Sequence, residues 1–131
     1  MNLKMSWTLN GTGGNKQIQS WNTILDQLKK LQGKEGVLTL DVLDNVNNCA
    51  EMLQVRAENG FYVIMLGEIF EDEYRVRTYW ASSNEPNDTA TEMSILGDHW
   101  PKRQLIKNFD LVINIFKEFF DTGTISTDTL N

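Results

Sequence analysis

Three parts of the sequence hold residues that could do chemistry: a glycine-rich loop, the histidine and cysteine, and a run of carboxylates. The segment Gly11–Lys16 lies between a predicted strand and a predicted helix, where a phosphate-binding loop would be placed. A P-loop ends in Gly-Lys followed by Ser or Thr, whereas Gly14 is followed by Asn15-Lys16-Gln17. The hydroxyl that would hold Mg²⁺ is therefore missing, and the dinucleotide-binding pattern lacks its third glycine. We expect a tight turn here and no nucleotide cofactor.

His99 is the only histidine and Cys49 the only cysteine. A zinc site needs several such ligands at close spacing, and no such spacing occurs. A nucleophilic triad would require His99 to meet Cys49 or a serine from a distant part of the chain. We therefore expect no metal, no cofactor and no catalytic residue, and we predict that the protein is not an enzyme. One cysteine cannot form an intramolecular disulfide, so a reducing cytoplasm is the expected compartment.

The carboxylates Glu68, Glu71, Asp72 and Glu73 cluster around a predicted turn. They lack the alternating Asp or Asn, the central glycine and the distal Glu of a calcium-binding EF-hand loop. Two interpretations stay open, a solvated hairpin tip and a surface that faces a partner. Paired carboxylates could also do acid–base work, but nothing in the sequence indicates the cleft that such work requires.

The acidic residues are unevenly distributed along the chain, whose formal net charge is -6. Residues 35–98 hold 13 of the 18 Asp and Glu but only three of the 12 Lys and Arg. Phosphates would be repelled by this central region, which disfavours direct nucleic-acid binding, whereas a basic protein would be attracted. No apolar run approaches the roughly 20 residues of a membrane helix, so we expect no membrane partner.

We expect the partner surface on the sheet edge, turns and loops between Glu68 and Asp98. Tyr79 and Trp80 are candidate aromatic anchors, since Tyr and Trp are frequent in binding hot spots. The alternative for Trp80 is packing against a helix. The full set of candidate binding residues is Glu68, Glu71, Asp72, Glu73, Tyr79, Trp80, Glu85, Asp88, Glu92 and Asp98.

Two amphipathic helices are predicted to pack on one face of a sheet. The first runs from about Lys16 to Gln32, with apolar residues at steps of three and four, and ends at Gly33. The second runs from about Asp110 to Asp121, with a stripe rich in phenylalanine, and ends at Gly123. Apolar residues committed to these stripes leave the helices less surface for a partner.

Alternating apolar and polar residues predict the strands. Asn59-Gly60 is the strongest hairpin signal, because a type I′ turn requires positive φ at both central residues. Gly97–Lys102 is expected to be a loop. The predicted fold is a single α+β domain covering residues 1–131, with an antiparallel sheet of about five to six strands. The predicted strands are 5–9, 37–43, 52–58, 61–70, 74–81 and 93–96.

The closing helix resembles that of a widespread immunity-protein family. The matching segments are Ile106–Val112 and Phe116–Gly123, with a phenylalanine-rich turn before Thr-Gly. The segments Trp7–Gly14, Glu58–Tyr62, Val76–Tyr79 and Ile95–Trp100 resemble a related, uncharacterised bacterial family. After Gly123 the sequence Thr-Ile-Ser replaces the proline-containing stretch and closing tryptophan of the broader family.

This resemblance implies an immunity protein of a polymorphic-toxin or contact-dependent growth inhibition system. Such a protein binds its cognate toxin, often a nuclease with a basic surface, and neutralises it; we expect a monomer. The alternative is a small acidic secretion chaperone, which would hold an extended segment of an effector. The resemblance brings no catalytic residue to any position of this chain.

Overall fold

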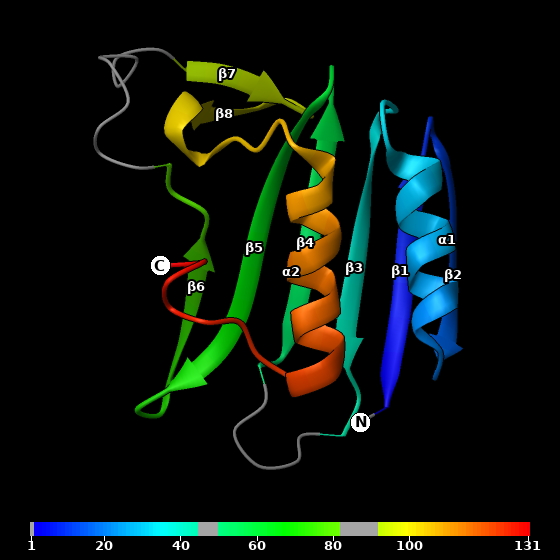
Figure 1. The fold of residues 1–131 in the computed structure, drawn as a ribbon, viewed down its shortest axis with the longest axis vertical. Coiled ribbons are helices and arrows are strands. Elements are labelled where there is room, and N and C mark those ends of the chain that lie inside the picture. Colours follow the sequence, from blue (N-terminus) through cyan, green and yellow to red (C-terminus); the bar gives the residue numbers. More distant parts are fainter. Residues whose placement is uncertain (1, 45–49, 82–91) are drawn as a thin grey trace.

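The computed structural model describes residues 2–44, 50–81 and 92–131. A six-stranded antiparallel sheet has the order β2-β1-β3-β4-β5-β6, and a two-stranded sheet pairs β7 with β8. Both helices cover the same face of the large sheet (Figure 1). The α+β prediction is confirmed. The strands are β1 Leu3–Leu9, β2 Thr12–Ile18, β3 Gly36–Val42, β4 Met52–Glu58, β5 Phe61–Phe70, β6 Glu73–Thr78, β7 Glu92–Ile95 and β8 Asp98–Pro101.

The helices are α1 (Trp21–Leu31) and α2 (Phe109–Thr122), with a 3-10 turn at Lys102–Gln104. The Asn108 side chain caps α2 by accepting a hydrogen bond from the Asp110 N–H. Gly123 ends α2 in the left-handed conformation, as its position predicted.

Residues 12–18 form a strand, so the prediction of a helix from Lys16 is wrong. Asn10 and Gly11 have φ of 50° and 87°, and Leu9 pairs directly with Thr12. This is a two-residue hairpin turn of the type I′ kind, so the chain returns along β1 and the helix starts only at Trp21. Ile18, which lies within the predicted helix, is buried at the end of β2 instead.

The main core lies between the sheet and the helices. Phe116 and Phe119 of α2 are fully buried, and Trp21 of α1 packs against Phe120 with ring centroids 5.9 Å apart. From the sheet, alternate residues point into this layer, because successive side chains of a strand point to opposite faces. The strand residues that belong to it include Leu3, Met5, Leu38, Leu40, Leu53, Val55, Ile64 and Leu66.

A smaller core lies on the opposite face of the sheet. Val63 alternates with Tyr62 and Ile64, so it points away from the helices, and it packs with Ile95 of β7 and with Leu105. The prediction of a loop at residues 97–102 is therefore wrong in part, because Asp98–Pro101 forms β8 and pairs with β7. The β7–β8 hairpin therefore covers one end of the face that the helices leave open.

Candidate functional site

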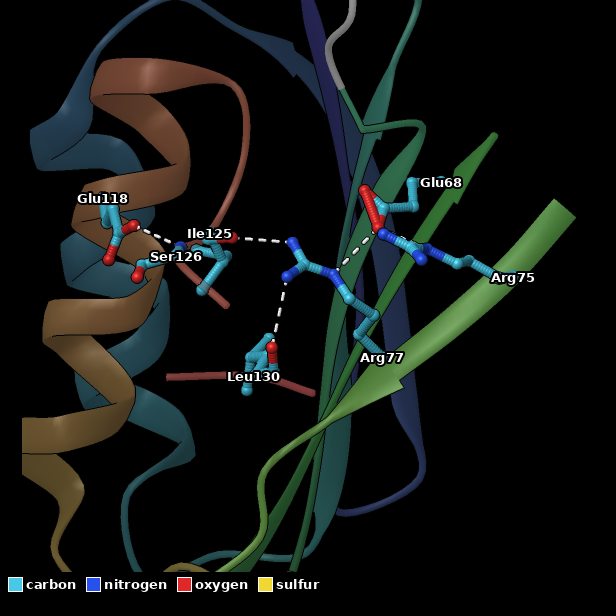
Figure 2. A network of polar contacts seen from close by, with 7 residues as sticks. All are labelled: Glu68, Arg75, Arg77, Glu118, Ile125, Ser126 and Leu130. Atoms are coloured by element: carbon cyan, nitrogen blue, oxygen red, sulfur yellow. Dashed lines mark hydrogen bonds and ion pairs between the residues drawn. The ribbon is translucent and has the colours of Figure 1, made fainter. Parts of the chain in front are cut away.

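Glu68 and Arg77 form a buried polar network between the sheet and the chain beyond α2. The Arg77 guanidinium donates to the carbonyl oxygens of Leu130 (3.1 Å) and Ile125 (2.6 Å). Its Nε lies 2.8 Å from Glu68 Oε1, although the N–H is poorly aligned with that oxygen. The same carboxylate oxygen accepts from Arg75 Nε at 2.9 Å (Figure 2). Glu68, a candidate partner residue, is therefore engaged in internal contacts.

This network also ties residues 125–130 to α2. The Ser126 N–H donates to Glu118 Oε2 at 2.6 Å, on the side of the segment opposite Arg77 (Figure 2). Ile125 and Leu130 are buried in the main core. The segment after Gly123 thus fills the space between β6 and α2.

The acidic turn, defined as Glu71, Asp72 and Glu73, joins β5 to β6 and is exposed. Glu71 and Asp72 have φ of 51° and 65°, and Phe70 pairs directly with Glu73. The turn therefore has the two-residue geometry that usually carries Asn-Gly. Within residues 2–44, 50–81 and 92–131, no ion pair includes any of these three carboxylates.

Beside this turn lies an exposed apolar strip, defined as Ile69, Tyr74 and Val76. Their side chains are 50%, 53% and 47% exposed. They point to the face opposite the helices, because they alternate with Arg75 and Arg77, and Arg77 points toward the helix layer (Figure 2). The Tyr74 side chain reaches across Gly67, where an added Cβ would collide with its hydroxyl.

The apolar strip was not among the candidate surfaces predicted from the sequence. The sequence shows the alternation of Tyr74 and Val76 with Arg75 and Arg77. Such a pattern ordinarily predicts that the apolar residues are buried and the arginines exposed. Here Arg77 is buried instead, because carbonyl groups and a carboxylate surround its guanidinium. The strip is exposed as a consequence.

The two aromatic candidates lie in different environments. Trp80 follows the end of β6 and is 42% exposed, so it is accessible to a partner. Tyr79 packs against the main core and is half-buried, which leaves it less suited to anchor a partner.

The remaining candidates do not form one patch with the acidic turn. Glu92 and Asp98 belong to the β7–β8 hairpin, at the end of the sheet opposite the β5–β6 turn (Figure 1). Asp98 also forms an ion pair with Arg56 of β4, with Oδ2 and Nη1 2.7 Å apart. Glu85 and Asp88 lie outside the described residues.

The residues considered for chemistry are not brought together. His99 is exposed on β8, and Cys49 lies outside the described residues. In the described part of the chain, no three His, Cys, Asp or Glu side chains are placed so that they could hold a metal ion. A shallow groove on the sheet is lined by uncharged residues: Ser6, Trp7, Thr8, Val37 and Thr39.

Comparison with known proteins identifies the family of this chain. Residues 3–129 match the model of a family of unknown function, DUF6911. The chain belongs to DUF6911. No curated protein matches this DUF6911 chain.

A solved structure shares the DUF6911 fold. A hypothetical protein from Neisseria gonorrhoeae is similar over 96% of this chain and 91% of its own, with a TM-score of 0.77 and 21% sequence identity. No helix in the described part of the DUF6911 chain has the length and apolar character needed to cross a bilayer.

Proposed function

We propose that the protein is an immunity protein that binds a cognate secreted toxin in the cytoplasm and blocks it. A toxin domain with a basic surface, such as a nuclease, is the partner that its charge favours. The resemblance of residues 106–112 and 116–123 to the closing helix of immunity proteins supports this class of function.

The observation that carries the proposal is the acidic turn beside the apolar strip. Exposed carboxylates that form no ion pair with the described part of the chain raise the encounter rate with a basic protein. Exposed Ile69, Tyr74 and Val76 then provide apolar area that binding removes from water. Isolated exposed apolar residues are common on protein surfaces, whereas neighbouring ones bordered by polar groups favour an interaction site.

The direct test is neutralisation of the toxin encoded beside this gene. Expression of that toxin domain alone should stop growth of a host cell, and co-expression of this protein should restore it. The purified pair should form a stable complex. A folded toxin domain that neither binds nor is neutralised contradicts the proposal.

Charge reversal of the acidic turn tests how binding occurs. The triple variant Glu71→Lys, Asp72→Lys and Glu73→Lys should slow association with the toxin domain and flatten its dependence on salt, because exposed charges act mainly on the encounter. Binding kinetics at two salt concentrations measure this, and circular dichroism checks that the variant folds.

A second triple reversal controls for total charge. Asp26, Glu35 and Asp110 are exposed elsewhere on the protein, and their replacement by Lys changes the net charge equally. This control should alter association far less. If the two variants behave alike, the acidic turn has no special role in recognition.

A secretion chaperone is the second candidate function. The apolar strip at the sheet margin favours it, since an extended client segment could lie there. A chaperone would bind an unfolded segment of its client, whereas an immunity protein would bind the folded toxin domain. Binding assays with both forms of the same partner distinguish the two.

A further inference from the structure

The outer edge of β6 carries backbone hydrogen-bonding groups that have no partner among the residues that the structure describes. The Thr78 N–H donates to the Asn131 carbonyl (3.2 Å), and the Thr78 carbonyl accepts from the Asn131 N–H (2.8 Å), both on the side away from β5. Backbone groups of a strand alternate in direction with each residue, so those of Val76 and Tyr74 point to this same side. Among the described residues, no backbone hydrogen bond beyond the β5–β6 ladder reaches Val76 or Tyr74.

Asn131 already pairs with this edge as a strand would. Two reciprocal hydrogen bonds between one residue and another are the antiparallel pattern. The pairing stops at Thr78, and the open stretch runs from Val76 back to the acidic turn. A partner segment placed beyond Asn131 would therefore extend the antiparallel pairing with β6 that Asn131 begins.

The side chains around the open stretch define what would fit. A residue paired with Val76 or Tyr74 has its side chain on the same face as theirs, next to the apolar strip. Apolar side chains at alternate positions of the added segment would cover that strip. An antiparallel segment would then run toward Glu73 and end beside the acidic turn, where Lys or Arg would meet carboxylates that form no ion pair in the described structure.

The opposite edge of the sheet offers a contrast. β2 is polar, with exposed Asn15, Lys16 and Gln17, and the Lys16 side chain is positively charged. It has neither exposed large apolar side chains nor an acidic turn. Charge and apolar area both distinguish the β6 edge as the one that suits a basic segment.

We propose that the edge of β6 between Glu73 and Val76 binds an extended segment on the surface of the folded toxin domain by antiparallel strand addition. The segment has apolar side chains at alternate positions, followed by Lys or Arg. This inference rests on the proposed function, since it specifies how the partner is held. Main-chain hydrogen bonds to Val76 and Tyr74 align the segment, and the strip and the acidic turn select its side chains.

A synthetic peptide tests this directly. The probe is acetyl-Thr-Val-Thr-Val-Lys-Lys-Lys-amide, and its controls are the same peptide with three Glu in place of Lys and the Lys peptide with both valine nitrogens methylated. Amide resonances of the ¹⁵N-labelled protein should shift at β6 and the acidic turn with the Lys peptide. The amides of Tyr74 and Val76 should exchange more slowly in the complex. Both controls should bind at least about tenfold more weakly.

Proline substitutions in the protein test the same edge. Val76→Pro removes an outward N–H and leaves the β5–β6 ladder intact, since an edge strand tolerates proline where its N–H faces solvent. It should weaken binding of the Lys peptide at least about tenfold. Asn15→Pro is the matched change at the β2 edge, where Thr12 faces β1 and Asn15 therefore faces outward, and it should leave binding unchanged.

Several results would overturn the inference. These are no saturable binding of the Lys peptide up to about 1 mM, equal binding of the methylated peptide, or resonance shifts confined to the helices or β2. A concentration-dependent dimer that Val76→Pro dissociates would identify a second copy as the occupant instead. If Val76→Pro still neutralises the toxin fully, strand addition is wrong and the immunity function stands; if the unaltered protein does not bind the toxin, the proposed function is wrong.

Discussion

Arg77 is buried because the chain around it supplies oxygen atoms to its guanidinium. Its side chain is 7% exposed, whereas Arg75, which shares the Glu68 carboxylate, is 41% exposed. Burying a charge is unfavourable unless opposite charge and hydrogen bonds compensate for the lost water. The two arginines thus contact one carboxylate from very different environments, and we expect them to differ strongly in their effect on stability.

Arg77→Ala should lower the free energy of unfolding by about 3–5 kcal/mol, because it leaves two carbonyl groups without their donor and removes a buried positive charge from beside Glu68. Arg75→Ala should cost less than about 1 kcal/mol, as exposed ion pairs do. Denaturant unfolding of both variants measures the difference. Equal losses would mean that the buried contacts of Arg77 add nothing beyond a surface ion pair.

Phe116 is fully buried between α2 and the sheet, where the helical spacing placed it. Phe116→Ala should cost about 3–5 kcal/mol, from lost apolar burial and the cavity left behind. Asn114→Ala, on the exposed side of the same helix, should change stability by less than about 0.5 kcal/mol. A loss below about 1 kcal/mol for Phe116→Ala, measured in the same denaturant series, would show that this position is not part of the core.

Tight hairpin turns decide much of the fold at the level of elements. In the described parts of the chain, four two-residue turns have positive φ at both central residues, at Asn10-Gly11, Asn59-Gly60, Glu71-Asp72 and Leu96-Gly97. Only Asn59-Gly60 was interpreted from sequence as this kind of turn. Asn10-Gly11 carries the same signal, but the polar, glycine-rich residues after it lack the alternation of a half-buried strand.

The edge position of β2 explains that error. Six of its seven residues are exposed or half-buried, so no apolar pattern is required of them. Helix stripes and central strands were predictable because each buries one face and shows the matching period. Arg77 and the apolar strip were not predictable, because the burial of Arg77 depends on carbonyl groups 48 and 53 residues away.

The backbone strain of the acidic turn should lower the stability of the fold, while its carboxylates provide negative surface charge. Left-handed backbone costs roughly 1–2 kcal/mol for a residue such as Glu, whereas Asp tolerates it better and Gly adopts it freely. The glycine also raises the entropy of the unfolded chain, which offsets part of the gain. Replacing Glu71 and Asp72 by Asn and Gly should therefore raise the free energy of unfolding by about 1 kcal/mol, while it slows association with a basic partner. Thermal or denaturant melts and binding kinetics measure the two effects.

The converse change supplies the control. Asn59→Glu with Gly60→Asp places the acidic pair in a turn of the same geometry, where φ is 55° and 79°, and should lower stability by a similar amount. If the acidic pair costs nothing at residues 59 and 60, backbone strain does not account for the effect at residues 71 and 72.

In the whole molecule, the two faces of the sheet are covered unequally. Helices cover one face along its length, and the β7–β8 hairpin covers part of the other (Figure 1). No described helix or hairpin covers that second face near the β5–β6 turn. The ion pair of Arg56 with Asp98 and the hydrogen bond from the Leu96 N–H to Glu58 Oε1 hold the hairpin on β4. The apolar strip and the acidic turn thus lie together, at the end of the sheet where β5 turns into β6.

This arrangement predicts a gradient of local stability. Amides of Leu40, Leu53 and Ile64 lie on central strands beneath the helices, and they should exchange with solvent most slowly. Amides of the exposed edge strand β2 should exchange orders of magnitude faster. Native-state hydrogen exchange followed by NMR measures both sets. Equal protection of β2 and β4 would mean that the sheet opens only as a unit.

The Arg77 network also has a consequence for synthesis on the ribosome. Arg77 is translated 48 residues before Ile125 and 53 before Leu130, the two residues whose carbonyl groups accept its hydrogen bonds. At about 5–20 residues per second, the first acceptor follows roughly 2–10 seconds later. During that interval a nascent sheet can form while its edge strand still lacks the segment that pairs with Thr78. The growing chain therefore passes through a period in which β6 is open along its full length to other nascent chains, and slower translation after Arg77 prolongs it.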